Sequence, residues 1–168
     1  MTQVRSISIG VWLTRGSRHE TAERGGIAHF VEHMLFKGTD DADRRRISRR
    51  RSTRSAASST RSPPRNTPAT TSRCSTSTCR SRIDILSDIV RNPAFSADDI
   101  EREKKVVLEE IKMVEDTPDD LVHELFTQGF WENHPLGRPI LGTKETVESF
   151  NADLLRDYFT QRLHGAAT

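Results

Sequence analysis

Apolar and polar side chains alternate along residues 4–13, VRSISIGVWL, and several of them are β-branched. A period of two predicts a strand with one buried face. After a polar loop, Gly25 and Gly26 open a segment that runs to about Lys37 with apolar residues at helical spacing. These residues are Ile27, Phe30, Val31, Met34 and Leu35. Gly38 is expected to end this helix as a glycine C-cap.

Helical patterns fill the second half of the chain. A short helix is expected over residues 83–92, before Pro93, and a long one after Ser96, whose spacing from Asp99 is that of an N-cap. Pro118 suits the first turn of the next helix, and two more helices follow over 144–150 and 151–163. The core candidates here are Ile85, Leu86, Ile89, Val90, Ile100, Val107, Leu108, Ile111 and Val114.

Composition divides the chain into two unlike parts. The 168 residues suffice for one domain, and the formal net charge is +2. Residues 44–82 hold 12 of the 21 arginines and no Asp or Glu; the other residues hold 14 Lys and Arg against 24 Asp and Glu, a net charge of −10. The basic part is rich in Ser and Thr and has no periodicity, so residues 43–82 are predicted to be a disordered, low-complexity insert.

Targeting signals are not evident in the sequence. No apolar run approaches the roughly 18 residues that a membrane span needs, and the N-terminus is too interrupted for a signal peptide. A cytoplasmic, bacterial location without membrane contact is the resulting expectation.

The first predicted helix carries chemistry on its polar positions. His29 and His33 are four residues apart, so both imidazoles point the same way and can hold one metal ion. Glu32 lies beside them, where a carboxylate can take a proton from a metal-activated water. The order H-x-x-E-H is the inverse of the commoner zinc-peptidase motif. On these five residues alone, an ordinary pair of helical histidines remains an alternative.

A third ligand has several candidates in the acidic helix, namely Glu101, Glu103, Glu109, Glu110 and Glu115. Glu103 and Glu110 are seven residues apart and share a face. Glu110 adjoins Ile111, which would place it at the edge of the buried side. The alternative is a solvated acidic surface.

The sequence segments around these residues resemble the N-terminal part of the M16 metallopeptidases, the family of pitrilysin, the insulin-degrading enzymes and the mitochondrial processing peptidase. The matching segments are SIGVW, GSRHE, GGIAHFVEHMLFKGT, DILSDIV, NPAF, IEREKKVVLEEI and HPLGRPILGT, over roughly residues 4–42 and 83–163. In that family, 76 residues separate H-x-x-E-H from a zinc-binding Glu. Residues 34–109 number 76, and Glu110 follows.

The resemblance implies a site and a fold. It implies Zn²⁺ on His29, His33 and Glu110, with Glu32 as the general base and Glu103 as a second catalytic-site carboxylate that supports the ligands. It also implies an α+β half-domain with helices packed on a mostly antiparallel sheet. The chain is then expected to be a single truncated N-terminal peptidase domain, residues 1–168, that hydrolyses peptides together with a second M16-like half or subunit.

Two alternative functions are considered beside that of an active peptidase. A catalytically inactive remnant or non-catalytic partner subunit would keep the fold without the chemistry. The twelve arginines also suit a nucleic-acid-binding arm, but no aromatic stacking residue occurs among them, so no nucleic-acid partner is expected.

Residues 43–82 match nothing in the family by amino acid, although the spacing across them is intact. At the corresponding positions, the family has the sequences Gly-Gly-x-Leu-Asn-Ala-Phe-Thr and Tyr-Thr-Cys-Tyr-Tyr. Written in GC-rich codons and read one base late, these become Ala-Ala-Ser-Ser-Thr-Arg-Ser-Pro and Thr-Pro-Ala-Thr-Thr. Those are residues 56–63 and 67–71 of this chain. Our hypothesis is that the segment is an out-of-frame translation.

This hypothesis predicts a pair of single-base changes in the DNA. Compared with related genes, one base should be gained or lost near the codon of residue 43, and a compensating change should restore the frame near Ile83. Resequencing the gene checks this, and an alignment without such a pair of changes would refute it.

Overall fold

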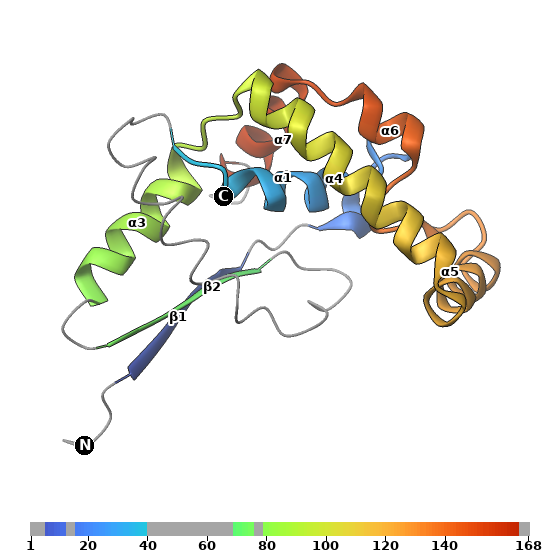
Figure 1. Ribbon diagram of the computed structural model, residues 1–168, viewed down its shortest axis with the longest axis horizontal. Coiled ribbons are helices and arrows are strands. Elements are labelled where there is room, and N and C mark those ends of the chain that lie inside the picture. The colour runs from blue at the N-terminus through green and yellow to red at the C-terminus, as the bar shows by residue number, and fades with distance from the viewer. Residues whose placement is uncertain (1–5, 13–15, 40–68, 76–78, 165–168) are drawn as a thin grey trace.

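The computed structural model describes residues 6–12, 16–39, 69–75 and 79–164. Strand β1 (Ser6–Trp12) pairs with strand β2 (Ala69–Ser75) in antiparallel register, Ser6 opposite Ser75 and Trp12 opposite Ala69. Figure 1 shows this two-stranded ribbon below the helical part of the molecule. The strand predicted over residues 4–13 is therefore present, and β2 lies inside the Arg-rich segment 43–82.

Helices make up most of the described residues. They are α1 (Ile27–Leu35), α3 (Cys79–Arg91), α4 (Ala97–Asp116), α5 (Pro118–Phe130), α6 (Lys144–Ser149) and α7 (Ala152–His164), with 3-10 turns at Ser17–His19, Ala22–Arg24 and Pro135–Gly137. Among the described residues, none of these helices is long and apolar enough to cross a membrane.

The expected fold class, α+β with helices packed on a mostly antiparallel sheet, is wrong for the described residues. They are mainly helical, and their strands amount to the single β1–β2 ribbon. The buried core lies between helices and the loops that join them. The physical reason lies in the amino acids of residues 44–82, the segment that does not match the family. This segment carries mostly Arg, Ser and Thr instead of the apolar aliphatic and aromatic side chains that a sheet buries.

Helix boundaries agree with the sequence signals at several points. The Ser96 hydroxyl accepts a hydrogen bond from the Asp99 backbone N–H at 3.3 Å, which confirms the predicted N-cap of α4. Pro118 opens α5 as expected. Two boundaries differ. Helix α1 ends at Leu35, three residues before Gly38, and α3 begins at Cys79 instead of residue 83.

The core is centred on α1, which packs against α4 and α7 (Figure 1). Six of its nine side chains are buried, namely Ile27, Ala28, Phe30, Val31, Met34 and Leu35. The Phe30 ring meets Phe150 edge-on, with 5.2 Å between centroids. Only His29, Glu32 and His33 remain partly exposed on this helix. Burial of the apolar face therefore fixes the direction in which these three polar side chains point.

The start of α1 approaches the loop before α6 closely. Gly26 has φ +85°, in the left-handed region, and a Cβ built on it would overlap the Leu141 carbonyl group. Glycine is therefore required here for two independent reasons, backbone conformation and space. The contact holds the first turn of α1 against a segment more than a hundred residues away in the chain.

Gly26→Ala is expected to lower the free energy of unfolding by at least about 2 kcal/mol, since a left-handed non-glycine residue and a backbone clash add together. Urea denaturation of the metal-free protein measures this. The matched control is Gly129→Ala in α5, where an added Cβ meets nothing within 4 Å. Alanine there should be neutral or stabilising because it is the better helix former. Equal stabilities of the two variants would contradict the account of Gly26.

Candidate metal centre

Two helices bring the polar side chains of the site together. His29 and His33 lie one turn apart on α1, and Glu110 lies on α4. His29 Nε2 is 3.1 Å from Glu110 Oε2, and His33 Nε2 is 3.6 Å from the same oxygen. The two imidazole rings are tilted by 55° with 4.5 Å between centroids. Residues 81 positions apart in sequence thus meet at one carboxylate oxygen.

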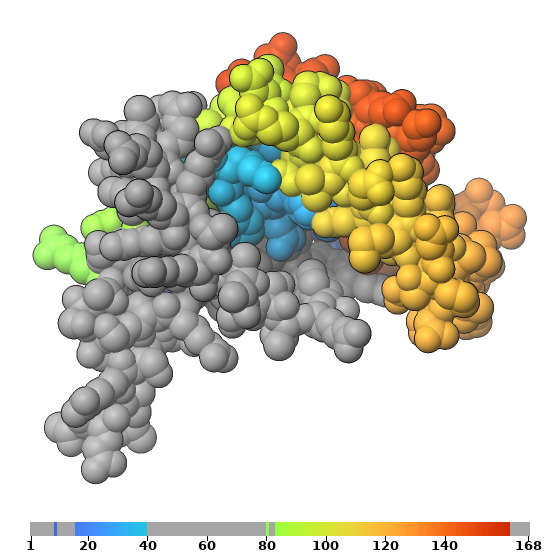
Figure 2. All heavy atoms as spheres, viewed as in Figure 1, coloured from blue at the N-terminus to red at the C-terminus, as the bar shows by residue number. Residues whose placement is uncertain are grey.

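One nitrogen from each histidine and one oxygen from Glu110 all lie within 4.8 Å of one another. Two imidazole nitrogens with one carboxylate oxygen form a donor set that suits Zn²⁺, with a fourth position left for water or substrate. The His29 and His33 side chains are each 22% exposed and Glu110 is 37% exposed. An ion could therefore reach these ligands from solvent. In Figure 2, part of α1 is visible at the surface beside α4.

The electrostatics of the cluster favour the protonation states that bind a cation. The hydrogen bond with His29 lowers the pKa of Glu110, which keeps this carboxylate ionised. Burial lowers the pKa of His33, and His29 lowers it further, against the opposing effect of Glu110 and Glu103. A neutral imidazole and an ionised carboxylate are the ligand forms that metals require.

Glu32 lies on the same exposed face of α1 but outside the three-residue ligand group. Burial raises its pKa, and the nearby His29 partly opposes this. A carboxylate with a raised pKa accepts protons more readily, which suits a general base.

Glu103 lies two turns before Glu110 on α4 and is only 3% exposed. Its Oε1 is 3.5 Å from His33 Nδ1, and its Oε2 pairs with Lys37 Nζ. His33 therefore lies between two carboxylates, one facing each ring nitrogen. All five site residues predicted from the sequence lie on α1 or α4, and three of them, His29, His33 and Glu110, lie close enough together to hold a metal ion.

Sequence analysis missed Glu20, a buried residue that anchors α1. Its two carboxylate oxygens accept hydrogen bonds from the backbone N–H groups of Gly26 and Ala28, each at 2.8 Å. Its backbone oxygen accepts a hydrogen bond from the Arg138 guanidinium. A carboxylate at a helix N-terminus satisfies donors without a partner in the helix and suits the helix dipole. An acidic residue a few positions before Gly25 is the signal that could have indicated this.

Glu20→Ala is expected to lower the free energy of unfolding by about 2–3 kcal/mol, because it leaves two buried N–H groups without an acceptor. Guanidinium denaturation of the metal-free protein measures the loss. Glu23→Ala is the control, since Glu23 is exposed three residues further on. If both variants unfolded at the same denaturant concentration, Glu20 would not be an anchor.

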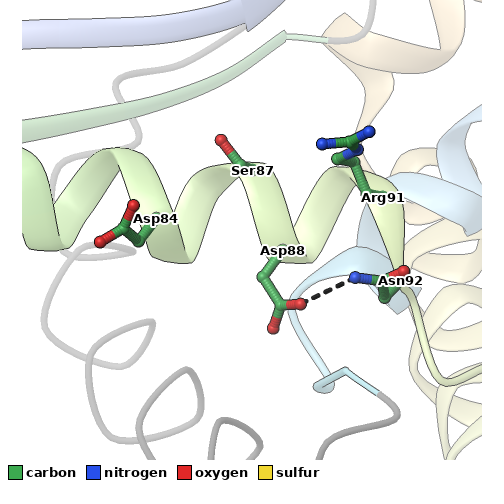
Figure 3. Close-up of a pocket in the computed structure, with 5 residues that line it drawn as sticks. All are labelled: Asp84, Ser87, Asp88, Arg91 and Asn92. Atoms are coloured by element: carbon green, nitrogen blue, oxygen red, sulfur yellow. Dashed lines mark hydrogen bonds between the residues drawn. The ribbon is translucent and has the colours of Figure 1, made fainter.

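A depression of about 360 Å³ lies on α3, apart from the His29, His33 and Glu110 cluster. Figure 3 shows its lining residues along this helix and just after its end: Asp84, Ser87, Asp88, Arg91 and Asn92. The Asn92 amide donates to Asp88 Oδ1 at 2.9 Å, which closes the last turn of the helix. Among the described residues, the His29, His33 and Glu110 cluster is the group that could hold a metal ion.

Comparison with known proteins extends these observations. The family described as insulinase, peptidase family M16, matches residues 2–144. An uncharacterized zinc protease of Bacillus subtilis, YmxG, is 43% identical over 155 residues, which cover 92% of this chain and 38% of that protein. One from Rickettsia bellii is 39% identical, covering 91% and 37%. The chain thus spans less than two-fifths of these relatives.

Solved structures share the fold at low sequence identity. A protease from Helicobacter pylori superposes with a TM-score of 0.79 at 19% identity, covering 94% of this chain and 38% of that one. The first half of the periplasmic protease PqqL from Escherichia coli has the same TM-score and identity, covering 95% and 36%. An M16 domain described as inactive, from Pseudomonas fluorescens, gives 0.79 at 14% identity, covering 94% and 38%.

Proposed function

Because the chain belongs to the insulinase family of peptidases, M16, we propose that it carries the zinc site of a metallopeptidase. In this proposal His29, His33 and Glu110 hold Zn²⁺, and Glu32 is the general base of peptide-bond hydrolysis. The observation that carries it is the convergence of two imidazole nitrogens and one carboxylate oxygen within 4.8 Å. That the relatives from Bacillus subtilis and Rickettsia bellii are named zinc proteases supports the choice of metal.

The residues divide the chemistry between two helices. A zinc ion bound there would polarise a water molecule and the carbonyl group of the peptide. Glu32, on the face of α1 next to the ligands, would accept the proton of the attacking water and pass it to the departing amine. Glu103 would hold His33 in place from the side opposite Glu110.

The substrate and partner follow from the same reasoning. We propose a peptide in extended conformation as the substrate class, since the peptide bond to be hydrolysed must reach a site on the surface of α1 and α4. The chain spans 36–38% of the Helicobacter pylori and Escherichia coli structures. We therefore propose that a second M16-like half, on the same or another chain, completes the enclosure of the substrate.

Zinc stoichiometry and peptide cleavage, measured on one preparation, test this function. We expect one zinc ion per chain by elemental analysis, and cleavage of fluorogenic peptides that a chelator stops. A chain that binds no zinc at saturating concentration would contradict the proposal.

Stoichiometric zinc without cleavage, also in the presence of a second M16-like half, would favour a non-catalytic subunit. That alternative has a precedent in the Pseudomonas fluorescens domain described as inactive, whose fold this chain shares.

A further inference from the structure

Lys37 continues the row of site residues on the α1 side of the centre. His29, His33 and Lys37 are spaced by four, and Lys37 lies in the turn that directly follows α1. On α4, Glu110 and Glu103 are spaced by seven. The two rows face each other, with His29 and His33 against Glu110, and His33 and Lys37 against Glu103.

The ion pair between Lys37 and Glu103 differs from the two lysine–glutamate pairs within α4. Lys112 with Glu109 and Lys104 with Glu101 are pairs within α4, three residues apart, and both glutamates are more than 60% exposed. Such pairs contribute little because water screens them. Lys37 instead joins two elements and contacts a carboxylate that is 3% exposed. A buried carboxylate is held in place by the partners of its two oxygens.

Each oxygen of Glu103 has a different partner. Oε2 pairs with Lys37 Nζ, and Oε1 faces His33 Nδ1 at 3.5 Å, slightly beyond the usual length of an N–H···O bond. The opposite ring nitrogen, Nε2, faces Glu110. An acceptor at Nδ1 favours the tautomer with the proton there, which leaves the Nε2 lone pair free to bind a metal.

We propose that Lys37 is a positioning residue of the metal centre. By holding Oε2 of Glu103, it directs Oε1 at the Nδ1–H group of His33 and so presents His33 Nε2 as the ligand atom. The inference deepens the proposed function and rests on it for the identity of the ion. Nothing in it requires Lys37 to touch the metal or the peptide.

Zinc affinity in three variants tests this role. Lys37→Met removes the charge and keeps the length of the side chain, and it should weaken zinc binding by about 10–100-fold, as expected for an outer partner of a ligand. Lys37→Arg keeps the charge and should restore most of the affinity. Lys112→Met breaks an exposed pair on α4 and should leave the affinity unchanged. Competition with a chromogenic chelator measures all three dissociation constants.

Unchanged zinc affinity in Lys37→Met would overturn the inference, and so would an equal loss in Lys112→Met. A second measurement decides the case in which Lys37→Met does not fold. Long-range ¹H–¹⁵N spectra of the zinc-free Glu110→Ala chain, in which the carboxylate that faces Nε2 is removed, should show His33 protonated at Nδ1. Protonation at Nε2 would overturn the inference. This readout stays valid if the chain binds no zinc, an outcome that contradicts the proposed function.

Discussion

Replacing Glu32 with glutamine is expected to leave zinc bound and to reduce peptide hydrolysis by about 10³-fold, within the range attributed to general acid–base catalysis. The amide is nearly the same size as the carboxylate but cannot accept the proton of the attacking water. Glu32 lies outside the group of three ligands, so the metal should stay in place. The loss should therefore appear in kcat, with little change in zinc stoichiometry.

Cleavage of a fluorogenic peptide, followed with zinc analysis of the same samples, measures both quantities. Glu109→Gln is the matched control, because it replaces a carboxylate with an amide at an exposed position of α4. It should retain full activity. Undiminished hydrolysis by Glu32→Gln would show that the proposed base is wrong while leaving the zinc site intact.

Removing one ligand is expected to have the second large effect. His33→Ala or Glu110→Gln should weaken zinc binding by more than about 100-fold, the upper end of the loss caused by outer partners of ligands. Either change leaves two of the three donors, which cannot complete the coordination of the ion. Hydrolysis should fall together with zinc occupancy.

Thermal unfolding with and without zinc gives an independent readout. Zinc at a hundred times its dissociation constant should stabilise the unaltered chain by about 2.7 kcal/mol, and the ligand variants should gain much less at the same concentration. His123→Ala and Glu109→Gln, both at exposed positions, serve as controls and should respond like the unaltered chain. Equal stabilisation of Glu110→Gln and the unaltered chain would exclude Glu110 as a ligand.

The helices and the shared face of His29 and His33 could be predicted because their signals are local. The apolar spacing from Ile27 to Leu35 is enough to define α1, and the same spacing leaves His29 and His33 on its polar face. Choosing Glu110 among five glutamates needed the family spacing, since periodicity alone also allowed a solvated surface. The structure brings that carboxylate to both imidazoles.

Other features depend on contacts that a sequence pattern does not contain. The acidic Glu20 a few positions before a glycine pair is a weak signal, because the burial of its carboxylate against the backbone of α1 depends on the folded loop. The pairing of Lys37 with Glu103 requires knowledge of how α1 and α4 pack. The sheet was overestimated for a different reason. The resemblance implied a mostly antiparallel sheet, but the amino acids of residues 43–82 are not those of a buried sheet.

The most direct test of the metal centre is X-ray absorption at the zinc edge on the loaded, unaltered chain. The account predicts a first shell of nitrogen and oxygen at about 2.0–2.2 Å with the signal of two imidazoles. A shell that contains sulfur at about 2.3 Å, which only Cys74, Cys79 or a methionine could supply, would contradict it. So would a shell without imidazole.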